Sequence, residues 1–441
     1  MSALRGALLL LAACALALLA SSCGGTKEPI RIAVLANCEG YLSGDFDVTL
    51  AGAELPLLQR GGKLVGAKPS DGVEGISVRG RRIELLPGCA GELTSGAVEL
   101  RRLVESEGAD IVVGPGVVPL GIVMVDYAKH QPGVTFAVTS WEVLTPLDPG
   151  PNVFRFTGGY AQGEAGLGSY AYHQLGWRRA VTITYPDAFG WGWAAGPTAE
   201  FCSLGGDIVD RVWLYNSPEK LAALLARAAS ERVDGYFLMT NGPEAGAFLK
   251  QLAKSERQLG RRVVSTAAAV TGLDRAVAAR LGKRLVGITA AWDVPGPFLP
   301  QFAAYAAAYR KAFPRIADAA DGTFHLFDIY YRNAMDGVLR ALEASGGDLS
   351  NDQRRFRAAL AGTKIDAPNG HIRLDVNRQA IGPTYMLQIS GNKGGALDYK
   401  VLKTVQNVDA SFGGHFGPGD PVPDRTQPPC RHGSPPAWAR R

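Results

Sequence analysis

The chain has 441 residues, of which 46% are hydrophobic, 8% aromatic and 20% charged, and its formal net charge is +5. The charges are scattered and form no long Lys/Arg run, which excludes the basic stripe of a nucleic-acid-binding protein. Beyond the N-terminal region, no segment reaches the roughly 18 uninterrupted apolar residues of a membrane-spanning helix. A chain of this length is too long for one hydrophobic core, so we expect at least two lobes.

The N-terminal residues have the pattern of an export signal. Arg5 supplies the positive charge, residues 7–20 are apolar, and Ser21-Ser22-Cys23-Gly24-Gly25 follow. The apolar run is shorter than the roughly 20 residues that cross a bilayer, which disfavours a permanent anchor helix. Residues 19–23 resemble the bacterial lipoprotein cleavage box, which implies removal of residues 1–22 and acylation of Cys23. Because Ala20 stands where such boxes usually carry leucine, cleavage one residue away and a non-lipidated product remain alternatives.

The cysteines predict two disulfides. Of the six cysteines, one lies in the signal and Cys23 is the lipidation site, so an even number remains for an oxidising compartment. Cys38 follows the first predicted strand and Cys89 the second, and the ends of neighbouring strands lie about 5 Å apart. Cys38–Cys89 is therefore the preferred bridge. Elimination leaves Cys202–Cys430, which would fasten the C-terminal tail.

Short apolar runs alternate with amphipathic patterns through the first half of the chain, as expected for buried parallel strands joined by helices. The predicted strands are 30–36, 83–86, 111–113, 134–138 and 153–156. The predicted helices are 49–59, 93–107 and 117–130. Strands separated by helices of this length indicate βαβ units and a parallel sheet.

The second half repeats this pattern and then changes. Strands are predicted at 180–184, 208–212, 236–239, 263–265 and 285–289, and helices at 161–175, 191–204, 218–231, 243–255, 297–312 and 323–344. From Gly370 the pattern becomes antiparallel β, with strands at 371–374, 384–389 and 400–402. Residues 412–441 are rich in Gly and Pro and predict a mostly disordered tail, apart from anchoring by Cys430.

No motif in the chain predicts an enzyme, a metal site or a cofactor. Residues 190–195 match the G-x-G-x-x-A form of a dinucleotide fingerprint, but Trp191 and Trp193 flank its glycines, which favours a tight strand-to-helix turn. The histidines show no metal-ligand spacing. The chain has no G-x-S-x-G elbow and no C-x-x-C, so a hydrolase would depend on unmarked residues.

Aromatic residues follow several predicted strands or lie at lobe transitions. Ligands of α/β sheets bind beside the carboxyl ends of the strands, where aromatic faces can stack on rings or hold a cation. The alternative is that these side chains pack in the core. The residues are Tyr41, Trp141, Phe189, Trp191, Trp193 and Trp292.

The order of elements resembles the type I periplasmic binding proteins, close to the Leu/Ile/Val-binding branch, over residues 30–405. The resemblance rests on residues 30–34, 52–54, 109–114, 154–157, 187–190 and 243–244. It implies an α/β fold of two doubly wound parallel-sheet lobes joined by three crossovers, near 156–158, 289–292 and 366–370. The implied boundaries are 30–156 plus 290–366 for lobe 1, 157–289 plus 367–408 for lobe 2, and 409–441 for the tail.

The resemblance also implies a ligand site between the lobes, with departures from amino-acid binders. Gly116-Val117-Val118-Pro119 stands where hydroxyls would hold a carboxylate, and Ala267–Ala269 where an acid would hold an ammonium group. A free α-amino acid is therefore not the expected ligand, although Glu142 could pair with a cationic group. The implied ligand residues are Tyr41, Gly116, Val117, Ser140, Trp141, Glu142, Phe189, Asn241, Ala268 and Trp292.

The implied function is capture of a small solute for an ABC importer. The implied partners are the solute, the permease and ATPase complex, and the membrane through the lipid on Cys23, with no nucleic acid. We expect a monomer in the periplasm or at the cell membrane, without a cofactor. A sensor module for a signalling partner and a hydrolase are the alternatives.

Overall fold

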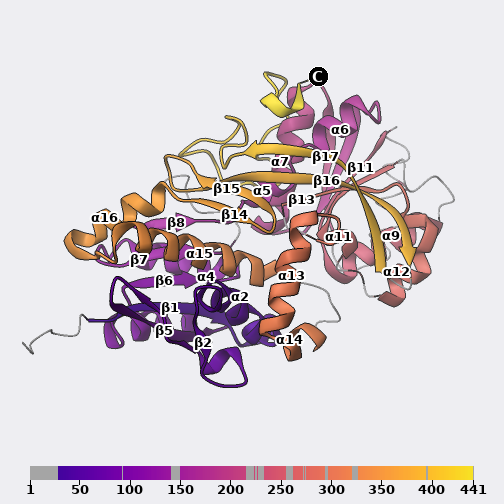
Figure 1. Cartoon of the computed structure of the whole chain (residues 1–441). Helices are drawn as coiled ribbons and strands as arrows, with labels where there is room; N and C mark the ends of the chain where they lie inside the picture. The colour runs from indigo at the N-terminus through magenta and orange to yellow at the C-terminus, as the bar shows by residue number, and fades with distance from the viewer. Residues whose placement is uncertain are drawn as a thin grey trace, which may run out of the picture.

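The computed structural model in Figure 1 comprises two large β-sheets with helices packed around them, and a separate two-stranded sheet. It describes residues 28–440 except 92, 141–148, 215–222, 224–225, 227–232, 255–261, 272, 274, 294–295, 320–325 and 394–395. The helix expected at 218–231 falls almost wholly outside this part of the chain, and Cys23, Trp141 and Glu142 fall outside it as well.

The first sheet has six strands in the order β4-β5-β1-β6-β7-β8. All neighbours are parallel except β4 and β5, which are antiparallel. The central strand β1 is apolar and almost fully buried, as expected for a strand covered on both faces. The strands are β1 (Ile30–Asn37), β4 (Ser77–Val78), β5 (Arg81–Ala90), β6 (Ile111–Gly114), β7 (Thr135–Val138) and β8 (Val153–Arg155); a small pair, β2 (Lys63–Leu64) and β3 (Val73–Glu74), lies outside the sheet.

Helices cover both faces of the first sheet. α3 (Leu93–Arg101) and α4 (Val118–Ala128) share one buried core with it. α2 (Phe46–Leu58), α15 (Leu326–Ser345) and α16 (Ser350–Ala361) share another. α15 comes from the late part of the chain and crosses α2 so closely that a Cβ at Gly52 would overlap the Asp328 backbone. Residues 290–366 are predicted to lie with the first lobe, and α15, which belongs to this segment, packs against the first sheet.

The second sheet has nine strands. β9 to β13 are parallel, whereas β13 pairs antiparallel with β16, so the predicted change to antiparallel β is confirmed. The strands are β9 (Arg179–Thr184), β10 (Asp207–Trp213), β11 (Gly235–Met239), β12 (Val263–Thr266), β13 (Thr289–Trp292), β14 (Lys364–Ala367), β15 (Gly370–Leu374), β16 (Ala380–Lys393) and β17 (Ala396–Val408).

Helices also cover both faces of the second sheet. α6 (Leu167–His173) and α7 (Ala188–Ser203) pack in one core, and α5 (Tyr160–Gly163) precedes them. α9 (Gly242–Lys254), α11 (Ala268–Thr271) and α12 (Arg275–Leu281) lie with the opposite core. α13 (Pro300–Ala312) and α14 (Pro314–Ala319) share a further core, which joins residues of α2 to residues of β16. The predicted α/β class with parallel-rich sheets is confirmed, while the exact lobe boundaries remain a prediction.

One predicted strand boundary is wrong. The strand expected at 285–289 begins only at Thr289, and 282–285 form a 3-10 helix. Leu285 and Ile288 are fully buried, and a short buried apolar run does not distinguish strand from helix by periodicity. Residues 289–292, near which a crossover is expected, form strand β13, and the crossover itself remains a prediction. Segment 366–370, also expected as a crossover, spans the end of β14 and its turn into β15.

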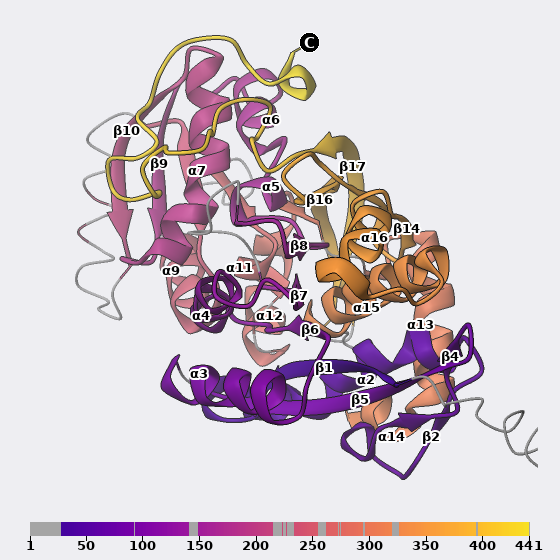
Figure 2. The same ribbon diagram turned by 90° about the vertical axis from the view of Figure 1, so that its left-hand side faces the viewer.

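The tail was expected to be mostly disordered, and residues 412–440 show that this expectation is wrong. Figure 2 shows the tail, in yellow, passing over α7 and beside β9 and β10. Phe412 is fully buried, and its ring meets the Trp438 ring edge-on at 5.2 Å. The Nζ of Lys403 donates to the carbonyl of Trp438 at 3.0 Å. The predicted Cys202–Cys430 bridge is present, with 5.2 Å between the Cα atoms.

Candidate functional site

The predicted ligand residues of the first sheet follow β1, β6 and β7. Tyr41 lies in the 3-10 helix Gly40–Asp45 after β1. Gly116 and Val117 are half-buried between β6 and α4, and a Cβ at Gly116 would lie 2.9 Å from the Phe327 ring. Close packing by Phe327 thus accounts for a glycine at position 116.

Ser140 follows β7 but is buried. Only 3% of it is exposed, and its carbonyl accepts a hydrogen bond from the Thr157 hydroxyl at 3.2 Å. A Cβ at Gly121 of α4 would overlap its hydroxyl. Ser140 therefore joins the end of β7 to the segment after β8, while its neighbours Trp141 and Glu142 lie outside the described residues.

The second sheet places its predicted residues after β9, β11, β12 and β13. Phe189 is half-buried in the first turn of α7, and Asn241, Ala268 and Trp292 are half-buried at the ends of the other three strands. The Asn241 carbonyl accepts from the Tyr185 hydroxyl at 2.6 Å. The Ala268 amide donates to the Thr266 hydroxyl at 3.4 Å. These four residues therefore share the carboxyl edge of one sheet.

Two of the candidate aromatic residues belong to the core instead. Trp191 and Trp193 are each 5% exposed and pack between α7 and the second sheet. The ring that accompanies Phe189 is Tyr160, which lies 6.3 Å from Phe189 and 5.0 Å from Trp193 between centroids. Phe189 and Tyr160 thus form an aromatic wall backed by Trp193. Tyr160 was missed because it precedes a helix pattern and follows no predicted strand directly.

Two buried acids, Glu164 and Asp293, follow α5 and β13, and sequence reasoning missed both. Burial raises the pKa of Glu164 well above its usual range, while a hydrogen bond with Thr266 opposes the shift and Asp293 adds to it. Burial also raises the pKa of Asp293, to about 7. Both groups are less than 8% exposed. Burial thus raises the pKa of two acids close to the carboxyl ends of β12 and β13.

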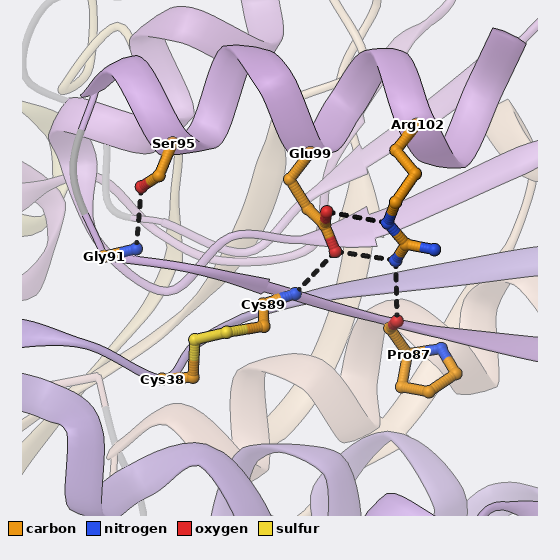
Figure 3. Close-up of a disulfide and its surroundings, with 7 residues drawn as sticks. All are labelled: Cys38, Pro87, Cys89, Gly91, Ser95, Glu99 and Arg102. Carbon is orange, nitrogen blue, oxygen red and sulfur yellow. Dashed lines mark hydrogen bonds and ion pairs between the residues drawn. A yellow bond between two sulfur atoms is a disulfide. The ribbon is translucent and has the colours of Figure 1, made fainter. Parts of the chain in front are cut away.

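The Cys38–Cys89 bridge ties together the carboxyl ends of β1 and β5, with 5.4 Å between the Cα atoms (Figure 3). The Cys89 amide donates to the Glu99 carboxylate at 2.9 Å, and Arg102 donates to the same carboxylate at 2.7 and 2.8 Å. The Arg102 hydrogen bond lowers the pKa of Glu99. The preferred Cys38–Cys89 bridge is confirmed. It restrains the end of β1, which precedes Tyr41.

The described residues contain one grouping with metal-ligand spacing, formed by Cys38, Glu39 and Cys89. Both sulfurs belong to the disulfide, so neither is a thiolate that binds a metal. Within the same part of the chain, no helix combines the length and the apolar composition needed to cross a membrane.

The two large sheets, each covered by helices on both faces, define a two-sheet α/β protein. A family model described as periplasmic binding protein matches residues 29–396. The chain belongs to this family, which implies an extracytoplasmic location. The comparison with curated proteins found no match.

Solved structures share the fold. An ABC transporter substrate-binding protein from Sphaerobacter thermophilus is 21% identical, with a TM-score of 0.72 over 87% of this chain and 99% of that one. An R. palustris solute-binding protein, solved with benzoate, is 20% identical, with a TM-score of 0.64 over 86% and 97%. A leucine-binding protein from Thermotoga maritima is 17% identical, with a TM-score of 0.64 over 86% and 99%.

Proposed function

We propose that this protein is the extracytoplasmic solute-binding component of an ABC importer, and that its solute is a small ring-bearing compound rather than a free α-amino acid. Closure of the two lobes around the solute would present it to a permease. The observation that carries the proposal is the apolar character of the loops after β6 and β12 in a binding-protein fold. Val117 and Ala268 offer neither a hydroxyl for a carboxylate nor an acid for an ammonium group.

The aromatic wall formed by Phe189 and Tyr160 supports a solute that contains a ring. Phe189 and Tyr160 present half-buried faces at the carboxyl edge of the second sheet. Aromatic pairs in offset or edge-to-face geometry contribute about 0.5–1.5 kcal/mol beyond their buried area. Among proteins of similar fold, one from R. palustris was solved with benzoate and another with 4-hydroxybenzoate.

Because Phe189 is part of the aromatic wall, we expect Phe189→Ala to weaken the binding of a ring-bearing solute. Benzoate, 4-hydroxybenzoate, leucine and isoleucine are the probes, and thermal shift is the measurement. A binding probe at about 100 times its Kd adds about 2.7 kcal/mol to the free energy of unfolding. We expect a ring-bearing probe to raise the Tm of the wild-type protein and Phe189→Ala to weaken its binding about tenfold, equal to about 1.4 kcal/mol.

The matched control is Phe416→Ala, which removes a half-buried ring from the tail, 5.8 Å from Phe412. This variant should bind the same probe with unchanged affinity. A Tm that rises with leucine or isoleucine but with neither ring-bearing acid would overturn the proposed ligand class.

The lipid anchor is also part of the proposal. Cys23 follows the export signal, and multiple acyl chains on one residue hold a protein at a membrane more firmly than a single chain. Growth with an alkyne-tagged fatty acid should label the wild-type protein and leave Cys23→Ala unlabelled. Equal labelling of both would disprove anchoring at this residue.

A further inference from the structure

Asp293 lies where elements of the two sheets meet. It directly follows β13, and 7% of it is exposed. The Gly158 amide, in the segment between β8 and α5, donates to its carboxylate. A Cβ at Gly158 would lie 2.7 Å from Oδ2 of Asp293, so only glycine allows this approach. The segment after β8 is thereby held against the end of β13.

A second contact comes from the turn between β14 and β15. The Nδ2 of Asn369 donates to the Asp293 carbonyl at 2.9 Å, and the Asn369 carbonyl accepts from the Tyr385 hydroxyl of β16 at 2.8 Å. The Nδ2 of Asn333, on α15, donates to Oδ1 of Asn369 at 3.1 Å. Asn369 thus connects a helix of the first sheet with two strands of the second.

Polar contacts also connect Asp293 with the candidate ligand site. Glu164 faces Asp293 and hydrogen-bonds with Thr266, whose hydroxyl accepts from the Ala268 amide. Oε2 of Glu164 is buried and has no hydrogen-bond partner among the described residues. A chain of polar contacts therefore leads from Asp293 to the loop that begins at Ala268.

We infer that Asp293 is a positioning residue for solute binding. Together with Gly158 and Asn369 it forms a junction, which fixes the position of the segments between the two sheets relative to the loop at Ala268. The inference rests on the proposed function for its consequence, because lobe closure depends on these segments. It does not require Asp293 to touch the solute. Loss of the junction weakens binding by loosening the arrangement of the two sheets.

The protonation of Asp293 gives the junction a pH dependence. The titratable groups that face it are the Glu164 carboxyl, from the turn after α5, and the Tyr330 hydroxyl of α15, which lies 3.4 Å from Oδ1. Burial favours the neutral form of Asp293 and raises its pKa to about 7. The junction is therefore most stable below about pH 3.8 and loses stability as pH rises to about 7, because over this range an opened segment releases a proton that the closed junction keeps.

Hydrogen exchange of the ligand-free protein tests the junction directly. Asp293→Ala should raise exchange about tenfold in peptides that cover 156–159 and 367–370, an opening of about 1.4 kcal/mol. Asp293→Asn, which mimics the neutral carboxyl, should stay within about twofold of the wild type at pH 4. After correction for intrinsic rates, the wild-type segments should loosen between pH 4 and 7, and those of Asp293→Asn should not.

Two further variants keep the test decisive. Asp328→Asn changes another buried acid, which accepts from the Tyr305 hydroxyl at 2.9 Å, and should alter exchange in α2, α13 and α15 but not in 156–159 or 367–370. Asn369→Ala removes the second contact and should loosen 156–159 if Asp293→Ala does not fold. Unchanged exchange in both distant segments, or an equal rise in α9 and α16, would overturn the inference. Because no solute is added, this result is independent of the proposed ligand.

Discussion

Replacing Glu54 with glutamine is expected to make the protein more stable than the wild type at pH 8, while leaving the two equal near pH 4.5. Glu54 lies in α2 and is 2% exposed. Burial raises its pKa to about 9, and Asp47 and Asp71 add to the shift. Its Oε2 has no hydrogen-bond partner among the described residues. The folded protein therefore keeps a proton that the unfolded chain has already lost.

The raised pKa of Glu54 determines whether the free energy of unfolding rises or falls with pH. The contribution of Glu54 to stability is fully present below the unfolded value of 4.5 and is lost as pH rises through about 9. Each unit between these values removes about 1.4 kcal/mol from the free energy of unfolding. Glutamine does not titrate, so the variant escapes a loss of about 3–5 kcal/mol at pH 7–8.

Urea unfolding at pH 5, 6.5 and 8 measures this effect. The wild type should lose more stability over this range than Glu54→Gln does. Glu74→Gln, at an exposed position in β3, is the control and should follow the wild type. Parallel pH profiles for the wild type and Glu54→Gln would show that the buried carboxyl is not protonated in the folded protein.

Removing the Cys202–Cys430 bridge is expected to lower the free energy of unfolding by about 3 kcal/mol and to free the tail. The bridge joins residues 228 positions apart, so it restricts the unfolded chain strongly. In the folded protein it holds the tail beside β10, where the Ile208 amide donates to Sγ of Cys430 at 3.4 Å. The Cys202→Ser, Cys430→Ser double variant should be cut by protease within residues 417–429.

The other bridge provides the comparison. Cys38 and Cys89 are 51 positions apart, so in the chain-entropy model their replacement should cost about 1 kcal/mol less. That variant should keep the tail resistant to protease. A Cys202→Ser, Cys430→Ser variant with wild-type stability and a protease-resistant tail would mean that packing of Phe412 and Trp438 alone holds the tail.

The sequence predicts the sheets well where strands are apolar and bounded by helices. Ile30–Asn37 and Tyr236–Met239 are buried runs that are too short for core helices, and both are strands. The disulfides could be paired because Cys38 and Cys89 end neighbouring parallel strands. Gly/Pro content misled the prediction for the tail, since order there comes from Phe412, Trp438 and Cys430 packing on distant segments.

The candidate site was predictable only in part. Phe189, Asn241 and Ala268 follow strands, and the structure places them at the carboxyl edge of the second sheet. Glu164 and Asp293 have no local pattern that predicts burial, because an acid is usually exposed. Their role depends on the approach of Gly158 and Asn369, which come from distant parts of the chain. Only the tertiary structure brings these groups together.

Mass spectrometry of small molecules released by denaturing the purified, exported protein tests the central proposal most directly. We predict one ring-bearing solute in near-stoichiometric amount, which raises the Tm of the refolded, ligand-free protein when it is added back. A free α-amino acid released in that amount, and rebinding with the same effect, would contradict the proposed function.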